Sequence, residues 1–413
     1  MPKFSNHLYR NAVNWIVLLC GGTSFLTLYS PSSLSSGLSI FALILIFYTD
    51  YQFIRDLASR NRAPIFLILL TFLMATLLST IPTKTIKSLY DFLRAFSLFI
   101  VFSYLGERFE SKTILRTLSI LAIATLIYSL INAALSTYPP EAIIDSRKWK
   151  YILEVPYSRN IIATQVALIS APVLCILLDQ RLYITSAEKV LYTAFIALSG
   201  AIILLSQSRG TLLAIAITVA STGFFYGHKS TFKRIMPILI VYLAIMPIFD
   251  KEVLDSLASR LNGSQDLLNG RAPIYSATWN FITESPWTGY GPGTFKHLDV
   301  VDKFVHPHSL YLELLFSLGF IGSILLTAGL LLLSPNRTTP LPTEDALKRF
   351  SSILLLFILA RGIFDIHLFV YDTWAIVFTA LGAGALKIRP RKVSHTARKF
   401  FKHPHTTKNR DKI

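Results

Sequence analysis

Two histidines at the start of an apolar segment give this sequence its clearest candidate for chemistry. His306-Pro307-His308-Ser309 leads into a hydrophobic stretch, and Gly319-Phe320-Ile321-Gly322 follows nine residues after Ser309. Ionisable groups at membrane depth are costly and tend to mark function, and imidazole is the side chain that titrates near neutral pH. We therefore take His308 as the candidate proton-handling group. We expect the two glycines to let the following helix pack closely against its neighbours.

Three arginines near the ends of predicted segments are candidates for binding an anion. Arg209 lies at a very short connection between two apolar stretches, and Arg271 precedes a predicted interfacial helix that ends near Thr283. Arg361 lies in another apolar stretch, four residues before Asp365. Arginine stays charged and presents a rigid fork of donors that suits phosphate. Two fixed arginines beside a titratable histidine would suit a reaction with a phosphate leaving group.

Each of these arginines also has a structural alternative. Arg209 could reach lipid headgroups from a helix end, and Arg271 could be an ordinary loop charge. Arg361 with Asp365 has the spacing of an intramembrane ion pair on a helix, and the same holds for Arg94 with Asp91 three residues before it. The residue types alone leave these alternatives open.

The histidine has a structural alternative as well, because His308 could be an interfacial residue without a chemical role. Glu313 lies five residues beyond it. On a continuous helix that spacing rotates the carboxylate by about 140° from the histidine. We therefore do not expect Glu313 to orient the imidazole of His308.

The composition predicts a membrane protein. Hydrophobic residues make up 53% of the 413 residues and charged residues 15%, with a mean hydropathy of +0.52, whereas soluble proteins are about a quarter charged. A spanning helix needs about 20 mostly apolar residues. The sequence therefore predicts an all-α polytopic membrane protein with about twelve transmembrane helices, at 12–30, 36–53, 63–82, 86–105, 112–135, 160–178, 190–207, 210–227, 233–249, 308–334, 347–368 and 370–388.

The distribution of positive charge predicts the orientation of these spans. With the N-terminus in the cytoplasm, the cytoplasmic segments carry most of the 40 Lys and Arg residues, as the positive-inside rule requires. Both termini are then cytoplasmic, and the two largest loops, 136–159 and 250–307, face outward. Arg159, at the end of the first of these loops, could contact substrate phosphates or the membrane surface, or it could be a solvated charge.

The remaining features argue against other kinds of partner. Much of the net charge of +17 lies in the tail 389–413, which we expect to contact anionic headgroups rather than nucleic acid, since it has too few aromatic residues to stack bases. Cys20 and Cys175 lie in predicted spans and suit neither a disulfide framework nor a metal site. The acidic residues of loop 250–307 are scattered. We therefore expect no metal and no cofactor, because arginines can neutralise charge in their place.

The spacing of the candidate residues resembles that of the bacterial O-antigen ligase family. Arg209-Gly210-Thr211-Leu212-Leu213 matches one signature of the family, Arg followed by three residues and Leu. His308-Ser309, nine residues, Gly319, two residues and Gly322 match the other. Arg271 and the turn 286–293 resemble the family's large periplasmic loop. The signature region, roughly 190–330, is shared with O-antigen polymerases and protein O-oligosaccharyltransferases.

The resemblance implies a fold and a reaction. The fold would be a GT-C-type glycosyltransferase, with residues 1–388 forming one membrane domain and the 250–307 loop between helices nine and ten. The reaction would be a metal-independent, inverting transfer of O-antigen polysaccharide from undecaprenyl pyrophosphate to a sugar hydroxyl of lipid A-core. It would take place at the periplasmic face of the cell inner membrane of a Gram-negative bacterium.

The resemblance also assigns roles to residues. His308 would be the general base, or a hydrogen-bonding partner, for the acceptor hydroxyl, while Arg209 and Arg271 would hold the pyrophosphate. Further candidates for contact with a substrate are Ser309, Arg94, Arg159 and Arg361. A polymerase or a protein O-oligosaccharyltransferase remains the alternative within the superfamily. From another class, the alternative is a transporter or flippase of lipid-linked glycans, which would bind its cargo near the bilayer midplane.

Overall fold

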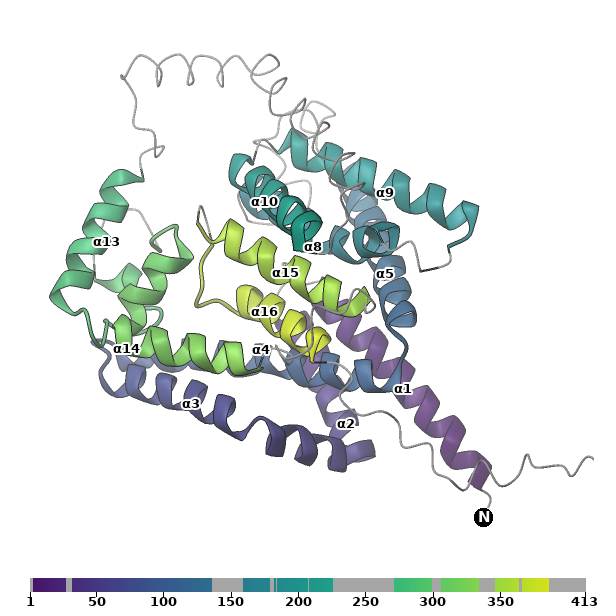
Figure 1. Cartoon of the computed structure of the whole chain (residues 1–413), viewed down its shortest axis with the longest axis horizontal. Helices are drawn as coiled ribbons and strands as arrows, with labels where there is room; N and C mark the ends of the chain where they lie inside the picture. Colours follow the sequence, from purple (N-terminus) through teal and green to yellow (C-terminus); the bar gives the residue numbers. More distant parts are fainter. Residues whose placement is uncertain are drawn as a thin grey trace, which may run out of the picture.

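The computed structural model of the chain describes residues 3–26, 32–135, 159–178, 182, 184–206, 208–225, 271–298, 306–333, 346–363 and 366–385. Every regular element in these ranges is a helix (Figure 1). The predicted span 233–249, the predicted outward loop from 136 to 158 and the basic tail 389–413 lie outside the described residues.

Each of the other predicted spans coincides with a helix. Their bounds are α1 Lys3–Leu26, α2 Ser32–Arg60, α3 Arg62–Leu77, α4 Pro82–Arg108, α5 Ser111–Leu135, α8 Arg159–Leu178, α9 Ser186–Leu205, α10 Arg209–Phe225, α14 Leu310–Leu333, α15 Ala346–Arg361 and α16 Tyr371–Gly384. The short helix predicted after Arg271 is α13, Ala272–Glu284, and it precedes the 3-10 turn η1, Phe295–His297. The stretch predicted at 347–368 ends as a helix at Arg361, because Gly362 and Ile363 form a turn.

The lengths of these helices are those of a membrane protein. Judged by length and composition alone, five helices of the described ranges could cross a bilayer: Leu34–Arg60, Pro82–Arg108, Ser111–Ile131, Ser186–Leu204 and Leu310–Leu333. The helices α3, α15 and α16 are shorter, with 16, 16 and 14 residues. The part of the chain that the structure describes is therefore all-helical and consistent with an integral membrane protein.

Short local signals define where helices begin. At the start of α9, the Thr185 hydroxyl accepts the backbone N–H of Glu188 at 3.2 Å, and the Glu188 carboxylate accepts the backbone N–H of Thr185 at 2.8 Å. This reciprocal capping box satisfies two N–H groups that a helix start leaves without a partner. Arg116 of α5 donates to the same carboxylate at 3.0 Å, so the cap also links α5 to the start of α9.

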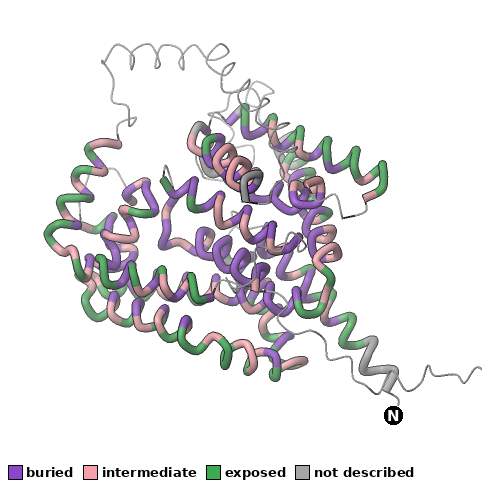
Figure 2. The backbone as a smooth tube through the Cα atoms, in the orientation of Figure 1, coloured by how far each residue is buried: buried purple, intermediate pink, exposed green. Residues whose placement is uncertain are grey.

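The core of the molecule surrounds α15 and α16. These helices lie between α8 and α10 on one side and α4 on the other (Figure 1), and they form the most continuously buried part of the tube in Figure 2. Trp374 of α16 is 1% exposed, with ring centroids 4.8 Å from Phe92 and 5.9 Å from Phe378. Because both helices are held in the core, the connection between them is held there too.

A second, smaller core lies at the end of the molecule where α13 meets α14 (Figure 1). Ile274 and Ile282 of α13 pack with Phe295 and Phe316. The Phe316 ring of α14 also stacks on Tyr290, with centroids 5.2 Å apart. The apolar face of α13 is thus packed on α14, as expected for an amphipathic helix that does not span the membrane.

Candidate active site

The His306–Ser309 segment forms a tight turn directly before α14. His308 has a φ of 54°, a left-handed conformation that is uncommon outside glycine, although Asn, Asp and His adopt it more often than other residues. Its backbone N–H donates to Nδ1 of His306 at 3.1 Å, and the centroids of the two imidazole rings are 4.1 Å apart. The next residue, Ser309, is buried, and its carbonyl accepts the N–H of Glu313 at 3.0 Å. The conformation of His308 is therefore held by specific contacts, as strained residues at functional sites are.

Helix α13 brings Arg271 to the same end of the molecule. Arg271 is the N-cap residue of α13, and its carbonyl accepts the N–H of Tyr275 at 2.9 Å. The Tyr275 hydroxyl, one turn further along, donates to the carbonyl of His308 at 3.4 Å. Since one helical turn rises about 5.4 Å, α13 ties the Arg271 end of the loop to the histidine turn.

The signature glycine Gly319 breaks α14 rather than simply allowing close packing. Its φ is 61°, and α14 is kinked at this position. A continuous helix would join the N–H of Phe320 to the carbonyl of Phe316, and that of Ile321 to Ser317. Both bonds are replaced by bonds to the turn 286–291: Tyr290 N–H to Phe316 O at 2.9 Å, Gly291 N–H to Ser317 O at 2.9 Å, Phe320 N–H to Pro286 O at 2.8 Å and Ile321 N–H to Trp287 O at 3.2 Å.

The exchanged hydrogen bonds bring two backbone segments together, and this close approach explains why a second glycine, Gly289, lies opposite Gly319. A Cβ on Gly319 would lie 2.4 Å from the backbone carbon of Trp287, and one on Gly289 would lie 2.6 Å from the backbone nitrogen of Gly319. Two stretches of backbone meet here without room for a side chain. The turn 286–291 thus takes part in the hydrogen bonding of α14, and these bonds attach the loop to the helix at Gly319.

We expect Gly319→Ala to destabilise the protein strongly. A residue with a side chain at this φ costs about 1–3 kcal/mol, and its Cβ would also meet the Trp287 backbone. The matched control is Gly200→Ala in α9, where a Cβ would meet nothing within 4 Å and helix propensity favours alanine by about 0.5–1 kcal/mol. Thermal unfolding of both purified variants in detergent checks the difference. Equal melting temperatures would contradict the role given to the break in α14.

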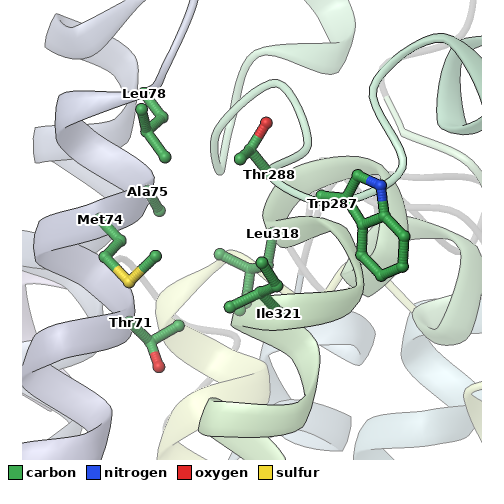
Figure 3. Close-up of a pocket in the computed structure, with 9 residues that line it drawn as sticks. Thr71, Met74, Ala75, Leu78, Trp287, Thr288, Leu318 and Ile321 are labelled. Atoms are coloured by element: carbon green, nitrogen blue, oxygen red, sulfur yellow. The ribbon is translucent and has the colours of Figure 1, made fainter.

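A small pocket lies between α3, the loop turn and the second half of α14. Its cavity volume is about 10 Å³, which is room for roughly one water molecule. Thr71, Met74 and Ala75 of α3 and its C-cap residue Leu78 line one side, and Thr288, Leu318 and Ile321 line the opposite side (Figure 3). The lining is mostly apolar, and the indole of Trp287 points away from it (Figure 3). The pocket is too small for a sugar and marks a packing junction.

Arg361 is connected to the turn that carries Arg209. It is 1% exposed at the end of α15, and its Nε donates to the Thr164 hydroxyl of α8 at 3.2 Å. Thr164 lies 3.2 Å from the Thr211 hydroxyl of α10, which lies 2.8 Å from the hydroxyl of Ser208. Arg361 therefore contacts protein groups that lead to the start of α10.

Two further candidates, Arg209 of the first signature and Arg159, can be placed only by their backbone. Arg209 is the first residue of α10, and Arg159 is the first residue of α8. The side chains of both lie outside the described residues. The roles expected for them therefore stay predictions.

Arg94 lies in a separate cluster near the start of α16. It donates to Asp91 at 3.1 Å and to the Ser36 hydroxyl at 2.5 Å. Its guanidinium carbon also lies 5.2 Å from the ring centre of Tyr90 and 4.8 Å from that of Tyr371. The pair predicted with Asp91 is thus present, and it joins α2, α4 and α16. The substrate role of Arg94 stays a prediction.

Glu313 and His367 are the residues at this site that the sequence did not indicate. The expectation for Glu313 assumed one helix through both it and His308, and that premise is wrong, since α14 begins at Leu310. Glu313 is buried and forms an ion pair with Nδ1 of His367, which stacks on His306 with centroids 4.9 Å apart. No local pattern could reveal this, because His367 lies in the turn between α15 and α16.

The loop turn contributes one further titratable contact. The Tyr290 hydroxyl donates to the Glu284 carboxylate at 3.1 Å. Burial, and then the hydrogen bond and charge of Glu284, raise the pKa of the Tyr290 phenol, so it remains a proton donor at neutral pH. Among the described residues, no group of three or more His, Cys, Asp or Glu side chains is arranged to hold a metal ion.

Apolar helices of membrane length are consistent with an integral membrane protein, and the strained histidine and the arginine-bearing loop lie together at one end of it. Residues 194–327, less than half of the chain, match the family described as O-antigen ligase. This matched range includes Arg209, Arg271 and His308. Arg94, Arg159, Arg361 and His367 lie outside the matched range. No curated protein matches the chain.

Proposed function

We propose that this protein is an O-antigen ligase with a GT-C-type membrane domain over residues 1–388 and about twelve spans. It transfers O-antigen polysaccharide from undecaprenyl pyrophosphate to a sugar hydroxyl of lipid A-core. The reaction takes place at the periplasmic face of the cell inner membrane, without a metal ion, and inverts the configuration at the transferred sugar. The match of residues 194–327 to the O-antigen ligase family supports the reaction type, and the geometry of the two signature segments supports the roles of individual residues.

The observation that carries this proposal is that the two signature segments are attached to two adjacent residues at the end of α15, one segment to each residue. The Arg361 side chain leads through Thr164 to the turn before Arg209. The carbonyl of Gly362 accepts the N–H of Leu310 at 2.8 Å, directly after the histidine turn. Segments about 100 residues apart in the chain are thereby joined at one buried point, as a shared site for donor and acceptor requires.

The chemistry assigned to this site is a single displacement. The acceptor hydroxyl oxygen attacks the anomeric carbon of the donor sugar, the bond from that carbon to the phosphate oxygen breaks, and undecaprenyl pyrophosphate leaves. The hydroxyl proton passes to the imidazole of His308, since histidine is the side chain that most often takes a proton as a general base. Arg209 and Arg271 hold the diphosphate and stabilise the negative charge that develops on it.

The other candidate residues fit this scheme in different ways. Arg361 would position the turn before Arg209, because its Nε is bonded to Thr164. Ser309 would hold the first turn of α14 through its backbone. Arg159, at the start of α8, and Arg94, in its cluster with Asp91, would contact the substrates at a greater distance from the reacting atoms.

A reconstituted transfer reaction tests the proposal. Purified protein is given an undecaprenyl-pyrophosphate-linked glycan together with lipid A-core, a second lipid-linked glycan, or an acceptor protein in parallel reactions. We expect the glycan on lipid A-core alone. Transfer only to the second lipid-linked glycan would show a polymerase, and transfer only to protein would show an oligosaccharyltransferase. Movement of the lipid-linked glycan across liposomes without any transfer would show a flippase.

The proposed orientation has its own test. The N–H of Thr80 donates to the carbonyl of Tyr290 at 3.2 Å, so the α3–α4 connection lies beside the loop turn. Arg108 and Asp50 form an ion pair at the other end of α4. We expect reporter fusions within 54–62 and after Lys387 to give a cytoplasmic signal, and a fusion within 255–300 to give a periplasmic one. A cytoplasmic signal from 255–300 would contradict the periplasmic site.

The arginine-based mechanism predicts that transfer persists when divalent ions are removed. Two guanidinium groups can neutralise a diphosphate without a cation. The measurement is the transfer rate of the purified protein in excess EDTA, compared with the same preparation after addition of Mg²⁺ or Mn²⁺. A strict requirement for an added divalent ion would contradict this mechanism.

A further inference from the structure

A buried carboxylate lies behind the histidine turn. Glu313, in the first turn of α14, is 2% exposed. One carboxylate oxygen pairs with Nδ1 of His367, and the other accepts the backbone N–H of Leu368 at 2.6 Å. Because a buried carboxylate is costly unless it is paired and hydrogen-bonded, this double contact fixes the turn between α15 and α16 onto the start of α14.

The imidazole of His367 in turn contacts the histidine turn. Its ring is parallel to that of His306 within 4°, with centroids 4.9 Å apart. His306 accepts the backbone N–H of His308 on its Nδ1 at 3.1 Å. A neutral imidazole that accepts on Nδ1 carries its proton on Nε2. The His308 N–H therefore determines the tautomer of His306, and the stacked ring of His367 supports the position of the His306 ring.

These contacts together determine the backbone of His308. Its left-handed φ of 54° is disfavoured for a residue with a side chain. The N–H is held by His306 and the carbonyl by Tyr275. The direction of the His308 imidazole follows from this backbone conformation, because allowed side-chain rotamers depend on φ and ψ.

We propose that Glu313 and His367 are positioning residues, which act through His306 to hold the His308 imidazole towards the acceptor hydroxyl. This inference rests on the proposed function, since it assigns His308 a role in transfer. Neither residue contacts the reacting atoms. His367 lies outside the range that matches the family, so the site of this chain extends into the turn between its last two described helices.

The test measures transfer kinetics of His367→Asn, Glu313→Gln and the double variant. Each single variant is expected to lower kcat by about 10- to 100-fold, the cost of a misplaced reacting group, with KM for the lipid-linked donor unchanged. Because the two residues act through one contact, the double variant should lose no more than the worse single variant. Additive losses, unchanged kcat, or a loss confined to donor KM would overturn the proposal.

Thr373→Val is the matched control for folding of the turn. The Thr373 hydroxyl donates to the carbonyl of His367 at 2.7 Å, so this variant disturbs the same turn and leaves the imidazole in place. We expect its kcat to equal that of the wild type. An equal loss of kcat in Thr373→Val and His367→Asn would show that only the fold of the turn matters, and would overturn the positioning role.

A second measurement does not depend on activity. The rate at which diethyl pyrocarbonate modifies His308, followed by mass spectrometry, should rise several-fold in His367→Asn and Glu313→Gln. Exposed His297 serves as the internal reference. An unchanged rate in both variants would overturn the positioning role. If the wild type transfers no glycan while the labelling rate of His308 changes as expected, the proposed function fails and the positioning role stands.

Discussion

Replacing His308 by alanine should nearly abolish glycan transfer while leaving donor binding largely intact. General-base assistance contributes about 10²- to 10⁴-fold to a rate, and the imidazole acts on the acceptor hydroxyl rather than on the diphosphate. The measurements are the transfer rate at saturating substrates and the affinity for the undecaprenyl-pyrophosphate-linked glycan. Both are made on purified protein.

The backbone of His308 requires a second variant in this experiment. Alanine at a φ of 54° could itself shift the turn, whereas asparagine tolerates the left-handed region. His308→Asn should therefore retain the fold and still lack the proton acceptor, so its rate should fall to the same level. His297→Ala, an exposed histidine of η1 in the same loop, should transfer at the wild-type rate. Normal turnover in His308→Asn would rule out the base assignment.

Replacing Arg209 or Arg271 by alanine should weaken donor binding and turnover together. Hydrogen bonds from a charged group contribute about 1.5–3 kcal/mol, so donor affinity should fall by about ten-fold or more. Turnover should fall by about 10²-fold, since the same contacts strengthen as charge develops on the leaving diphosphate. Lysine at either position keeps the charge without the fork of donors and should rescue activity only in part.

A matched control separates specific phosphate binding from general attraction to a basic loop. Lys296 is exposed on η1 of the same loop, and Lys296→Ala removes one positive charge there. Arg271 makes no side-chain hydrogen bond that caps α13, so Arg271→Ala removes no such cap. We expect Lys296→Ala to bind donor normally. Wild-type donor affinity in both Arg209→Ala and Arg271→Ala would contradict the diphosphate clamp.

The break in α14 connects these two sets of predictions. The turn 286–291 replaces two helical hydrogen bonds around Gly319, and α13 begins at the other end of the same loop segment. Helix α14 consequently holds this loop segment at the break around Gly319, and it begins directly after the histidine turn. A rigid scaffold of this kind is what keeps catalytic groups within reach of one another.

The sequence by itself determined the class of the protein and the position of most of its helices. Hydropathy is a local property, and a helix satisfies its own backbone hydrogen bonds, so the apolar stretches coincide with helices in every described range. The start of α13 was predictable for a similar reason, because the proline after Arg271 marks a first helical turn. The spacing of Arg209, His308 and Gly319 was sufficient to indicate the family that residues 194–327 match.

Only the tertiary structure decided what holds the candidate residues in place. The ion pair of Glu313 with His367 and the bond from Arg361 to Thr164 join residues far apart in the chain. The left-handed φ of Gly319 exists because a distant turn supplies the hydrogen bonds that α14 gives up. Such contacts have no periodic signature in a sequence, since they form only after helices pack and buried polar groups must find partners wherever the fold brings them.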